Sequence, residues 1–370
     1  MRTTHWVILG IVIICGVFLF YRFSDSEVVQ EVVGEIVQEF NIKDTPREEV
    51  VAKGLYLTGY SANNPKKRAE IIELIEATEL NAVVIDVKDY TGYILYDRPE
   101  GEDGVWLSKS IIDDPRVVVQ DFKDHGIYVI ARQTVFQDPI YAETVPQVAV
   151  RAGEDGIWRD YKGLAWVDAS QQEVWDYNLK IAQHTIDLGF DEINFDYVRF
   201  PSDGNLATAR FALNGKKKSE VMYDFFMYMY EHLKDEPAFI SYDVFGLTMD
   251  NTDFDLNIGQ RAVDILPYSD FVSPMIYPSH YPSGYAGFEN PAANPYGVIK
   301  ATMTAGQQHM TTSTVAAYRP WLQAFNIGAV YDAQKIRDQI RAVEEQPKNA
   351  GWLLWNARNV YSNKGLELAE

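Results

Sequence analysis

The stretch GFDEINFDYVRFP, residues 189–201, has the pattern of a buried β-strand that becomes polar toward its C-terminal end. Side chains alternate along a strand, so Asn194 and Asp196 share one face while Ile193 and Phe195 share the other. Pro201 cannot donate a ladder hydrogen bond, so we expect the strand to end near it. In parallel α/β folds the chemistry gathers at the C-terminal ends of strands. Asp196 is therefore a candidate active-site carboxylate, although a lone aspartate at such a position more often caps the next loop.

Segments with strand patterns alternate with helical patterns from about residue 53 onward. A doubly wound open sheet shows the same alternation, but it usually carries a Gly-rich phosphate loop after an early strand. Residues 60–64, YSANN, are no such loop. Eight strands with intervening helices over about 310 residues predict an α/β fold of the (β/α)8 TIM-barrel type. The expected strands are 53–60, 82–88, 126–136, 191–200, 239–247, 271–277, 321–326 and 351–355, and the expected helices are 65–79, 171–188, 219–234 and 332–345.

Composition excludes several classes of function. The 370 residues are 47% hydrophobic and 13% aromatic, which is typical of a chain with a substantial folded core. The formal net charge of -20 argues against nucleic acid as a partner, and against polyanionic glycans unless a local basic patch intervenes. Cys15 is the single cysteine and lies in an N-terminal apolar run. We therefore expect no disulfide, no cysteine-based zinc site and no thiol nucleophile.

The N-terminal apolar run predicts a membrane anchor. Trp6 to Tyr21 is an unbroken apolar segment preceded by Arg2, and it lacks the small residues of a signal-peptide cleavage site. An uncleaved signal anchor fits best, which gives a single-pass protein of the cell membrane with an extracytoplasmic domain. A cleaved secretory signal is the alternative. The expected organisation is a signal anchor at 1–23, an acidic linker at 24–52 and a barrel domain at 53–370.

Polar and aromatic residues follow several of the expected strands. Because these ends converge at the same mouth of a barrel, each strand exit supplies candidate site residues. Aromatic rings suit sugar binding because the apolar C–H face of a pyranose packs on a ring, although any single ring is as readily a core residue. The expected substrate-binding residues are Lys88, Arg132, Trp166, Asn194, Tyr197, Arg199, Tyr277, His280, Trp321, Trp355 and Asn356.

Two carboxylates on adjacent expected strands, Asp196 and Asp243, match what cleavage of a glycosidic bond requires. One protonates the leaving oxygen, and the other acts as nucleophile or activates water. Asp86 is the reserve carboxylate, because a buried ion pair with Lys88, two residues away on the same face, is its more ordinary role. The six histidines show no metal-binding spacing, and no nucleotide loop or Gly-x-Ser-x-Gly elbow occurs. We expect no metal and no cofactor.

Four phrases carry a resemblance to a known family. They are residues 189–204, the segment PMIYPSHY at 274–281, WLQ at 321–323 and GWLLWN at 351–356. Over roughly residues 53–361 the chain resembles a bacterial family of glycoside hydrolases that was long described as a domain of unknown function with a TIM barrel. The resemblance implies a secreted or anchored carbohydrate-active barrel acting on a poly- or oligosaccharide.

The resemblance also implies roles for two residues. In related glycosidase clans the aspartate on strand four is the nucleophile, which maps onto Asp196. The proton donor lies on strand five or six in different clans. Asp243 matches the former, and the sixth strand offers no carboxylate before Glu289. The chain departs from the family pattern at Arg358, which would alter a sugar subsite if it faced the cleft.

Two functions remain open on the sequence alone. The first is a glycosidase, with retention of configuration favoured because neighbouring strands lie only about 4.8 Å apart. The second is a non-catalytic glycan-binding barrel at the cell surface. The two differ in whether the carboxylates of Asp196 and Asp243 approach each other.

Overall fold

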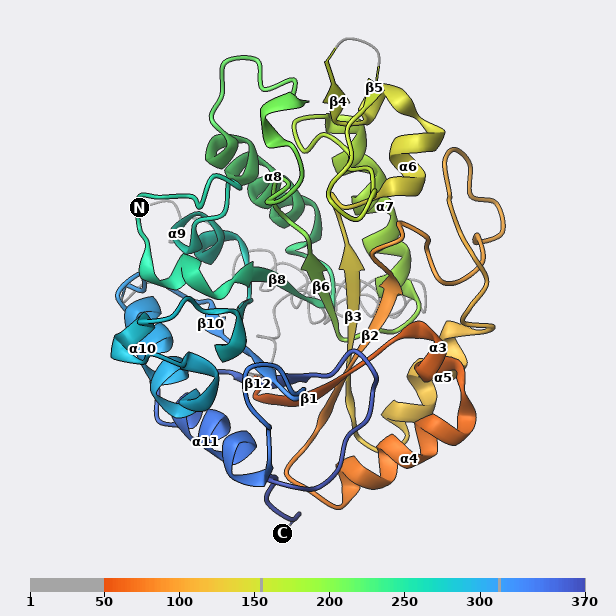
Figure 1. Cartoon of the computed structure of the whole chain (residues 1–370). Coiled ribbons are helices and arrows are strands. Elements are labelled where there is room, and N and C mark those ends of the chain that lie inside the picture. The colour runs from red at the N-terminus through yellow and green to blue at the C-terminus, as the bar shows by residue number, and fades with distance from the viewer. Residues whose placement is uncertain (1–49, 154–155, 312–313, 370) are drawn as a thin grey trace, which may run out of the picture. The chain divides into compact units, whose positions relative to one another are not determined.

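Eight parallel strands close into a barrel around which the helices are arranged (Figure 1). The structure, a computed structural model, describes residues 50–153, 156–311 and 314–369. Residues from Val51 onward form one compact unit. Around the barrel the hydrogen-bonded order is β1, β2, β3, β6, β8, β9, β11 and β12, and β12 pairs again with β1. These strands are β1 (Ala52–Leu57), β2 (Ala82–Lys88), β3 (Tyr128–Thr134), β6 (Glu192–Asp196), β8 (Phe239–Phe245), β9 (Phe271–Ile276), β11 (Trp321–Gln323) and β12 (Gly351–Trp355).

The predicted alternation of strands and helices is confirmed, with most differences at strand ends. The fourth strand ends at Asp196, four residues before the predicted limit, because Tyr197 has a φ of +53°, which takes it out of the ladder. The helices are α3 (Gly59–Asn63), α4 (Pro65–Glu76), α5 (Pro115–Lys123), α6 (Pro139–Thr144), α7 (Gln172–Asp187), α8 (Lys218–Leu233), α9 (Ala262–Ile265), α10 (Pro295–Gln307) and α11 (Ala333–Glu344).

Helix starts and stops follow the local sequence. Asn64 caps α4, because its side chain accepts hydrogen bonds from the backbone N–H groups of Lys66 and Lys67, and Pro65 occupies the first turn. Gly189 follows α7 with a φ of +96°, a conformation that glycine adopts without strain. The chain can therefore turn at once from α7 into β6, which carries Asp196.

The interior of the barrel is polar, whereas the layer between strands and helices is apolar. Outward residues such as Ile193 and Phe195 are fully buried in the core cluster. Inward residues form a hydrogen-bonded chain: Asn194 donates to Asp243 and to Ser241, and Ser241 donates to Glu192. These hydrogen bonds offset part of the cost of burying polar groups in the barrel, although Asn194 Oδ1 accepts none among the described residues.

A three-stranded antiparallel sheet lies in the loops that follow β3 and β6. It consists of β4 (Arg151–Ala152), β5 (Gly156–Ile157) and β7 (Ala209–Arg210), while the short β10 (Ala317–Tyr318) adds to β9 of the barrel. Asp168 ties these loops together by accepting a hydrogen bond from the backbone of Ala212. The sequence patterns did not indicate this small sheet.

The predicted N-terminal anchor and most of the acidic linker lie outside the described residues. No helix among the residues that the structure describes is long and apolar enough to cross a membrane.

Candidate active site

Asp196 and Asp243 stand side by side at the C-terminal end of the barrel. Phe195 of β6 is paired in register with Tyr242 of β8, so the residue that follows each of them lies at the same level. Side-chain alternation turns both carboxylates inward, away from the outward Phe195 and Tyr242. The two residues are 5% and 1% exposed, respectively. The two carboxylates that the sequence singled out are thus brought together by adjacent strands.

The Arg132 guanidinium links three carboxylates. Its Nη1 donates to Asp86 Oδ1 over 2.6 Å, and its Nη2 donates to Asp196 Oδ2. Its Nε lies 3.7 Å from Asp243 Oδ2. Arg132 comes from β3, between the strands that carry its partners, so a single planar group reaches all of them. The arrangement holds the Asp196 carboxylate in place and brings a positive charge close to Asp243.

The environment of Asp243 favours its protonated form. Burial raises the pKa of its carboxyl well above the usual range, and the neighbouring charge of Asp196 raises it further, against the lowering effect of Arg132. Its Oδ1 accepts hydrogen bonds from Asn194 Nδ2 at 2.9 Å and Trp321 Nε1 at 2.7 Å. Both bonds go to one oxygen, so Oδ2 is available to carry a proton.

Asp196 is surrounded by donors. Its Oδ2 accepts from Arg132, and its Oδ1 accepts from the backbone N–H of Tyr197 at 2.5 Å. Tyr197 adopts the left-handed conformation, which costs a non-glycine residue roughly 1–2 kcal/mol. Strain of this kind is typical of functional sites. Here it turns the N–H of Tyr197 back onto the carboxylate that precedes it.

Asp86 lies deeper and is held by two residues. Tyr56 donates its hydroxyl hydrogen to Asp86 Oδ2 at 2.5 Å, and Arg132 donates to Oδ1. Burial raises the pKa of Asp86. The ring of Tyr56 stacks on Trp355, with 3.9 Å between centroids, and the Arg132 guanidinium lies over both rings. Asp86 therefore positions Arg132 from below, and it does not line the cavity.

A cavity of about 180 Å³ opens directly above the carboxylates. Aromatic side chains form much of its wall, as expected for a site that binds the apolar face of a sugar. Its lining comprises Arg132, Asp196, Tyr197, Arg199, Asp243, Phe245, Met275, Tyr277, Trp321 and Trp355. Burial, together with the charges of Asp243 and Asp196, raises the pKa of the Tyr277 hydroxyl well above its usual range, so Tyr277 is a neutral hydrogen-bonding group.

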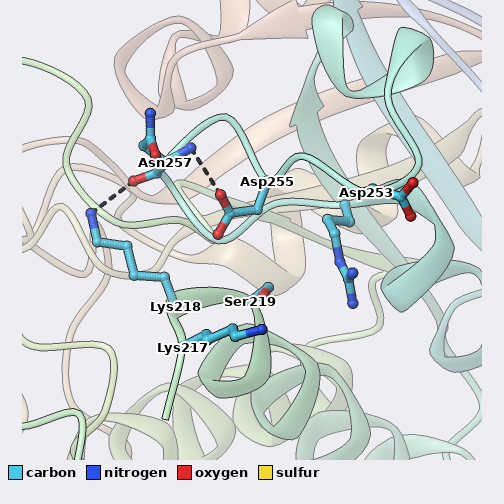
Figure 2. A pocket seen from close by; sticks show the side chains of 7 residues that line it. Lys217, Lys218, Ser219, Asp253, Asp255 and Asn257 are labelled. Atoms are coloured by element: carbon cyan, nitrogen blue, oxygen red, sulfur yellow. Dashed lines mark hydrogen bonds between the residues drawn. The ribbon is translucent and has the colours of Figure 1, made fainter. Parts of the chain in front are cut away.

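A larger pocket of about 310 Å³ lies at the start of α8 (Figure 2). Its lining is polar and mostly charged, and it contains no aromatic ring. Lys218 Nζ donates to the Asn257 carbonyl, so this cation is already engaged. The pocket holds no residue from the ends of the barrel strands, and we therefore place the candidate active site in the smaller, aromatic cavity. The residues that line the larger pocket at the start of α8 are Lys217, Lys218, Ser219, Asp253, Asp255, Asn257 and Arg261.

The predicted ion pair between Asp86 and Lys88 is wrong. The pairing of β2 with β3 skips Val87, which is a bulge, so Lys88 leaves the inward face of the strand. Its Nζ lies 2.8 Å from Asp138 Oδ2 and is fully buried. Lys88 is consequently absent from the cavity where the sequence placed it.

The other predicted substrate-binding residues divide into two groups. Arg132, Tyr197, Arg199, Tyr277, Trp321 and Trp355 line the cavity. Asn194 lies beneath it, Trp166 packs behind Arg199, and His280 is exposed beyond Tyr277. Asn356 donates to the Ala324 and Val360 carbonyls, a loop-holding role, and the exposed Arg358 is not among the lining residues.

Three residues of the site were missed from the sequence. Phe245 and Met275 line the cavity, and Tyr56 holds Asp86. Tyr56 lies on the inward face of the first strand, so period-two alternation could have found it. Met275 carried no such signal, because a methionine in a strand is ordinarily a core residue.

No group of three or more histidine, cysteine or carboxylate side chains within the described ranges could hold a metal ion.

Comparison with known proteins identifies the family. Residues 54–361 match the model of the family described as "Putative glycosyl hydrolase domain", and the chain belongs to this family. The glycoside hydrolase domain of PgaB (BpsB) from Bordetella bronchiseptica is similar over 84% of this chain and 95% of its own length, with a TM-score of 0.61 and 12% sequence identity. This likeness supports the barrel fold.

A hypothetical protein from Ruminiclostridium thermocellum is 36% identical over 51% of this chain and 97% of its own, with a TM-score of 0.47. No curated protein matches the chain.

Proposed function

We propose that this protein is a glycoside hydrolase that cleaves glycosidic bonds with Asp196 and Asp243. One observation carries the proposal: a single guanidinium, that of Arg132, contacts both carboxylates at the floor of one aromatic cavity. A pair of carboxyl groups in contact with the same sugar-sized space is the machinery of glycosidases. The family's description and its barrel fold agree with this assignment.

The two carboxyl groups have different environments and hence different roles. Asp196 is held by the Arg132 guanidinium and a backbone N–H, which suits an anion that attacks the anomeric carbon. Asp243, whose pKa burial raises, keeps a proton that it donates to the departing glycosidic oxygen. After the leaving group departs, Asp243 as a carboxylate takes the proton from the water that hydrolyses the glycosyl–enzyme ester.

The placement of the pair supports retention of configuration. Retaining enzymes have carboxyl groups about 5–5.5 Å apart, whereas inverting ones leave about 6.5–9.5 Å for a water molecule. Asp196 and Asp243 occupy the same level of neighbouring strands and share one arginine, which supports the shorter separation. A double displacement through Asp196 therefore fits the site better than direct attack by water.

A non-catalytic glycan-binding barrel is the weaker reading. It requires aromatic rings but gives no reason for two adjacent carboxyl groups at the cavity floor, one of which has a pKa raised well above its usual range. We further propose that Trp6 to Tyr21 anchors the protein with the barrel outside the cytoplasm, on the basis of its apolar sequence. Fractionation and N-terminal sequencing test this, since a mature N-terminus after Phe23 would show a cleaved signal instead.

A mechanism-based inactivator tests the proposed reaction. The full-length chain is first screened against aryl glycosides of both anomeric configurations and against polysaccharides. A 2-deoxy-2-fluoro glycoside of the accepted sugar should then form a stable ester with Asp196, detected by peptide mass spectrometry. NMR of the first-formed product should show the configuration of the substrate.

Glu289→Gln is the matched control, because Glu289 is an exposed carboxylate in the loop after β9, where related clans place their donor. It should leave turnover and labelling intact. An ester on Asp86 or Glu289, or an inverted product, would contradict the assignment of Asp196. Absence of turnover on every glycan, with binding retained, would instead favour the binding barrel.

A further inference from the structure

Arg199 stands apart from the other buried cations of the barrel domain. Among the described residues, five arginine and lysine side chains are buried, and four of them form an ion pair with a carboxylate. Arg199 is 8% exposed, and the carboxylates of the described residues act on it only through longer-range charge effects, with none within ion-pair distance. Burying an unpaired cation is costly, so its partner is expected to come from outside the chain.

The contacts of Arg199 leave part of its guanidinium free for a ligand. Its Nη1 donates to the Phe200 carbonyl at 3.1 Å and to Ser202 Oγ at 3.2 Å. Among the described residues no hydrogen bond leaves Nε or Nη2. Asp196, Asp203 and Asp160 act on the charge only from beyond contact distance, and burial lowers the pKa of Arg199.

Aromatic rings fix the plane of the guanidinium. The rings of Trp166, Tyr197 and Phe245 lie 5.0, 5.1 and 4.7 Å from its central carbon. Cation–π contacts stabilise the charge but provide no hydrogen-bond acceptor in the plane of the group. The guanidinium is thereby pre-organised to meet an acceptor edge-on, which is the approach of a planar carboxylate.

The local charge also differs from that of the whole chain. The cavity lining contains two arginines, Arg132 and Arg199, and two aspartates. Raising the pKa of Asp243 favours its neutral form, which weakens the negative charge of this lining, whereas the protein as a whole has a formal charge of -20. The guanidinium of Arg199 is therefore the part of the cavity to which an anionic group is attracted.

We propose that Arg199 binds the carboxylate of an acidic sugar, so that the substrate is a glycan with a uronic-acid-type residue at the cleavage site. This inference rests on the proposed function and specifies its substrate class. Arg199 and Asp196 line the same cavity, so the acidic residue lies in the subsite where the bond is broken. The remaining sugar atoms pack against the aromatic wall.

A matched pair of ligands tests the inference. Uronic-acid oligosaccharides are compared with the same oligosaccharides after chemical reduction of their carboxyl groups to hydroxymethyl groups. Binding to full-length Asp196→Asn protein, measured by calorimetry, should be on the order of 10- to 100-fold tighter for the acidic form. Arg199→Gln in that background should remove the difference between the two ligands.

Arg358→Gln is the control, because it removes the same charge from an exposed position after β12. It should keep the preference for the acidic ligand. Arg199→Lys keeps the buried charge but not the fork of donors, and it should lose most of the preference. If thermal melting shows that Arg199→Gln is unfolded, the binding preference of Arg199→Lys is the measurement that tests the inference.

The outcomes separate the two proposals. Binding to neutral glycans only, or to none, overturns the acidic-sugar inference, as does an undiminished preference in Arg199→Lys. If the chain nevertheless cleaves neutral glycosides through Asp196, the proposed glycosidase function is retained although the acidic-sugar inference is wrong. Arg199-dependent binding of acidic glycans without cleavage by the unmodified chain supports the inference and overturns the hydrolase.

Discussion

Both ends of the barrel interior contain buried arginine and carboxyl groups, but the charges are balanced at the N-terminal end and unbalanced at the C-terminal end. At the N-terminal end, Arg319 pairs with Glu192 through both carboxylate oxygens, at 2.9 and 2.7 Å, and both side chains are fully buried. Ser241 and Tyr128 also donate to Glu192. One cation therefore meets one carboxylate whose oxygens are all engaged, which is the condition under which a buried ion pair is tolerated.

At the C-terminal end the numbers do not match. Arg132 serves Asp86, Asp196 and Asp243, so it cannot neutralise all three as anions. Burial raises the pKa of both Asp243 and Asp86, and the charge of Asp196 raises that of Asp243 further, so protonation relieves the excess. A buried ion pair whose hydrogen bonds are all made stabilises the fold. A cluster beside a cavity that has more carboxyl groups than cations instead has perturbed pKa values, which suits acid–base chemistry.

The largest expected effect is the loss of turnover in Asp196→Asn. Asparagine preserves shape but cannot attack the anomeric carbon, so kcat should fall by more than about 10³-fold. Steady-state kinetics on an accepted aryl glycoside measures this, and calorimetry should show sugar binding nearly unchanged. Full activity in this variant would make Asp86 the carboxylate to test.

Asp243→Asn should depend on the leaving group. Loss of general-acid catalysis is expected to cost about 10²- to 10⁴-fold on substrates with poor leaving groups, and far less on activated aryl glycosides. Activity of the unmodified protein should fall as pH rises through the raised pKa of Asp243, because the proton is then lost. This alkaline limb should be absent from the variant. An unchanged limb would assign the proton to another group.

The same raised pKa has a definite sign for stability. Between its unfolded and folded pKa values, Asp243 is protonated only in the folded state, so the free energy of unfolding falls as pH rises. Asp243→Asn should therefore flatten the decrease in melting temperature on the alkaline side.

Glu192→Gln should destabilise the protein by about 3–5 kcal/mol, because it removes the negative charge to which the buried Arg319 guanidinium donates two hydrogen bonds. Chemical denaturation measures the change, and the pH profile of kcat should keep its shape. The double variant Glu192→Leu/Arg319→Met is the control and should recover much of the stability. A shifted alkaline limb in Glu192→Gln would mean that the two ends of the barrel are electrostatically coupled.

The smallest expected effect is that of Tyr56→Phe. It removes a hydroxyl that donates to buried Asp86, which costs about 1–3 kcal/mol because the buried carboxyl oxygen is left without that partner. As a positioning residue behind Arg132, it should lower kcat about 10-fold with little change in KM.

Tyr242→Phe is the matched control, because the Tyr242 hydroxyl is buried with no hydrogen-bond partner among the described residues. It should be neutral or slightly stabilising. Equal losses in both variants would indicate a packing effect.

The sequence by itself determined the repeating architecture and the position of the carboxylates. Strand periodicity and Gly189 predicted the strand that carries Asp196, although its end lies four residues before the predicted limit, and two strand ends predicted the approach of Asp196 and Asp243. These features are local: they depend on side-chain alternation and on the backbone freedom of glycine. The closed barrel then brings equivalent strand ends together.

Only the tertiary structure decided which charges are partners. A bulge at Val87 turned Lys88 away from Asp86 toward Asp138, and Glu192 found Arg319 at a sequence separation of 127 residues. A one-residue change of register reverses the face of a side chain, and long-range pairs leave no mark in local periodicity. The tertiary structure also decides the protonation of Asp243, because burial and neighbouring charges set the pKa of its carboxyl group.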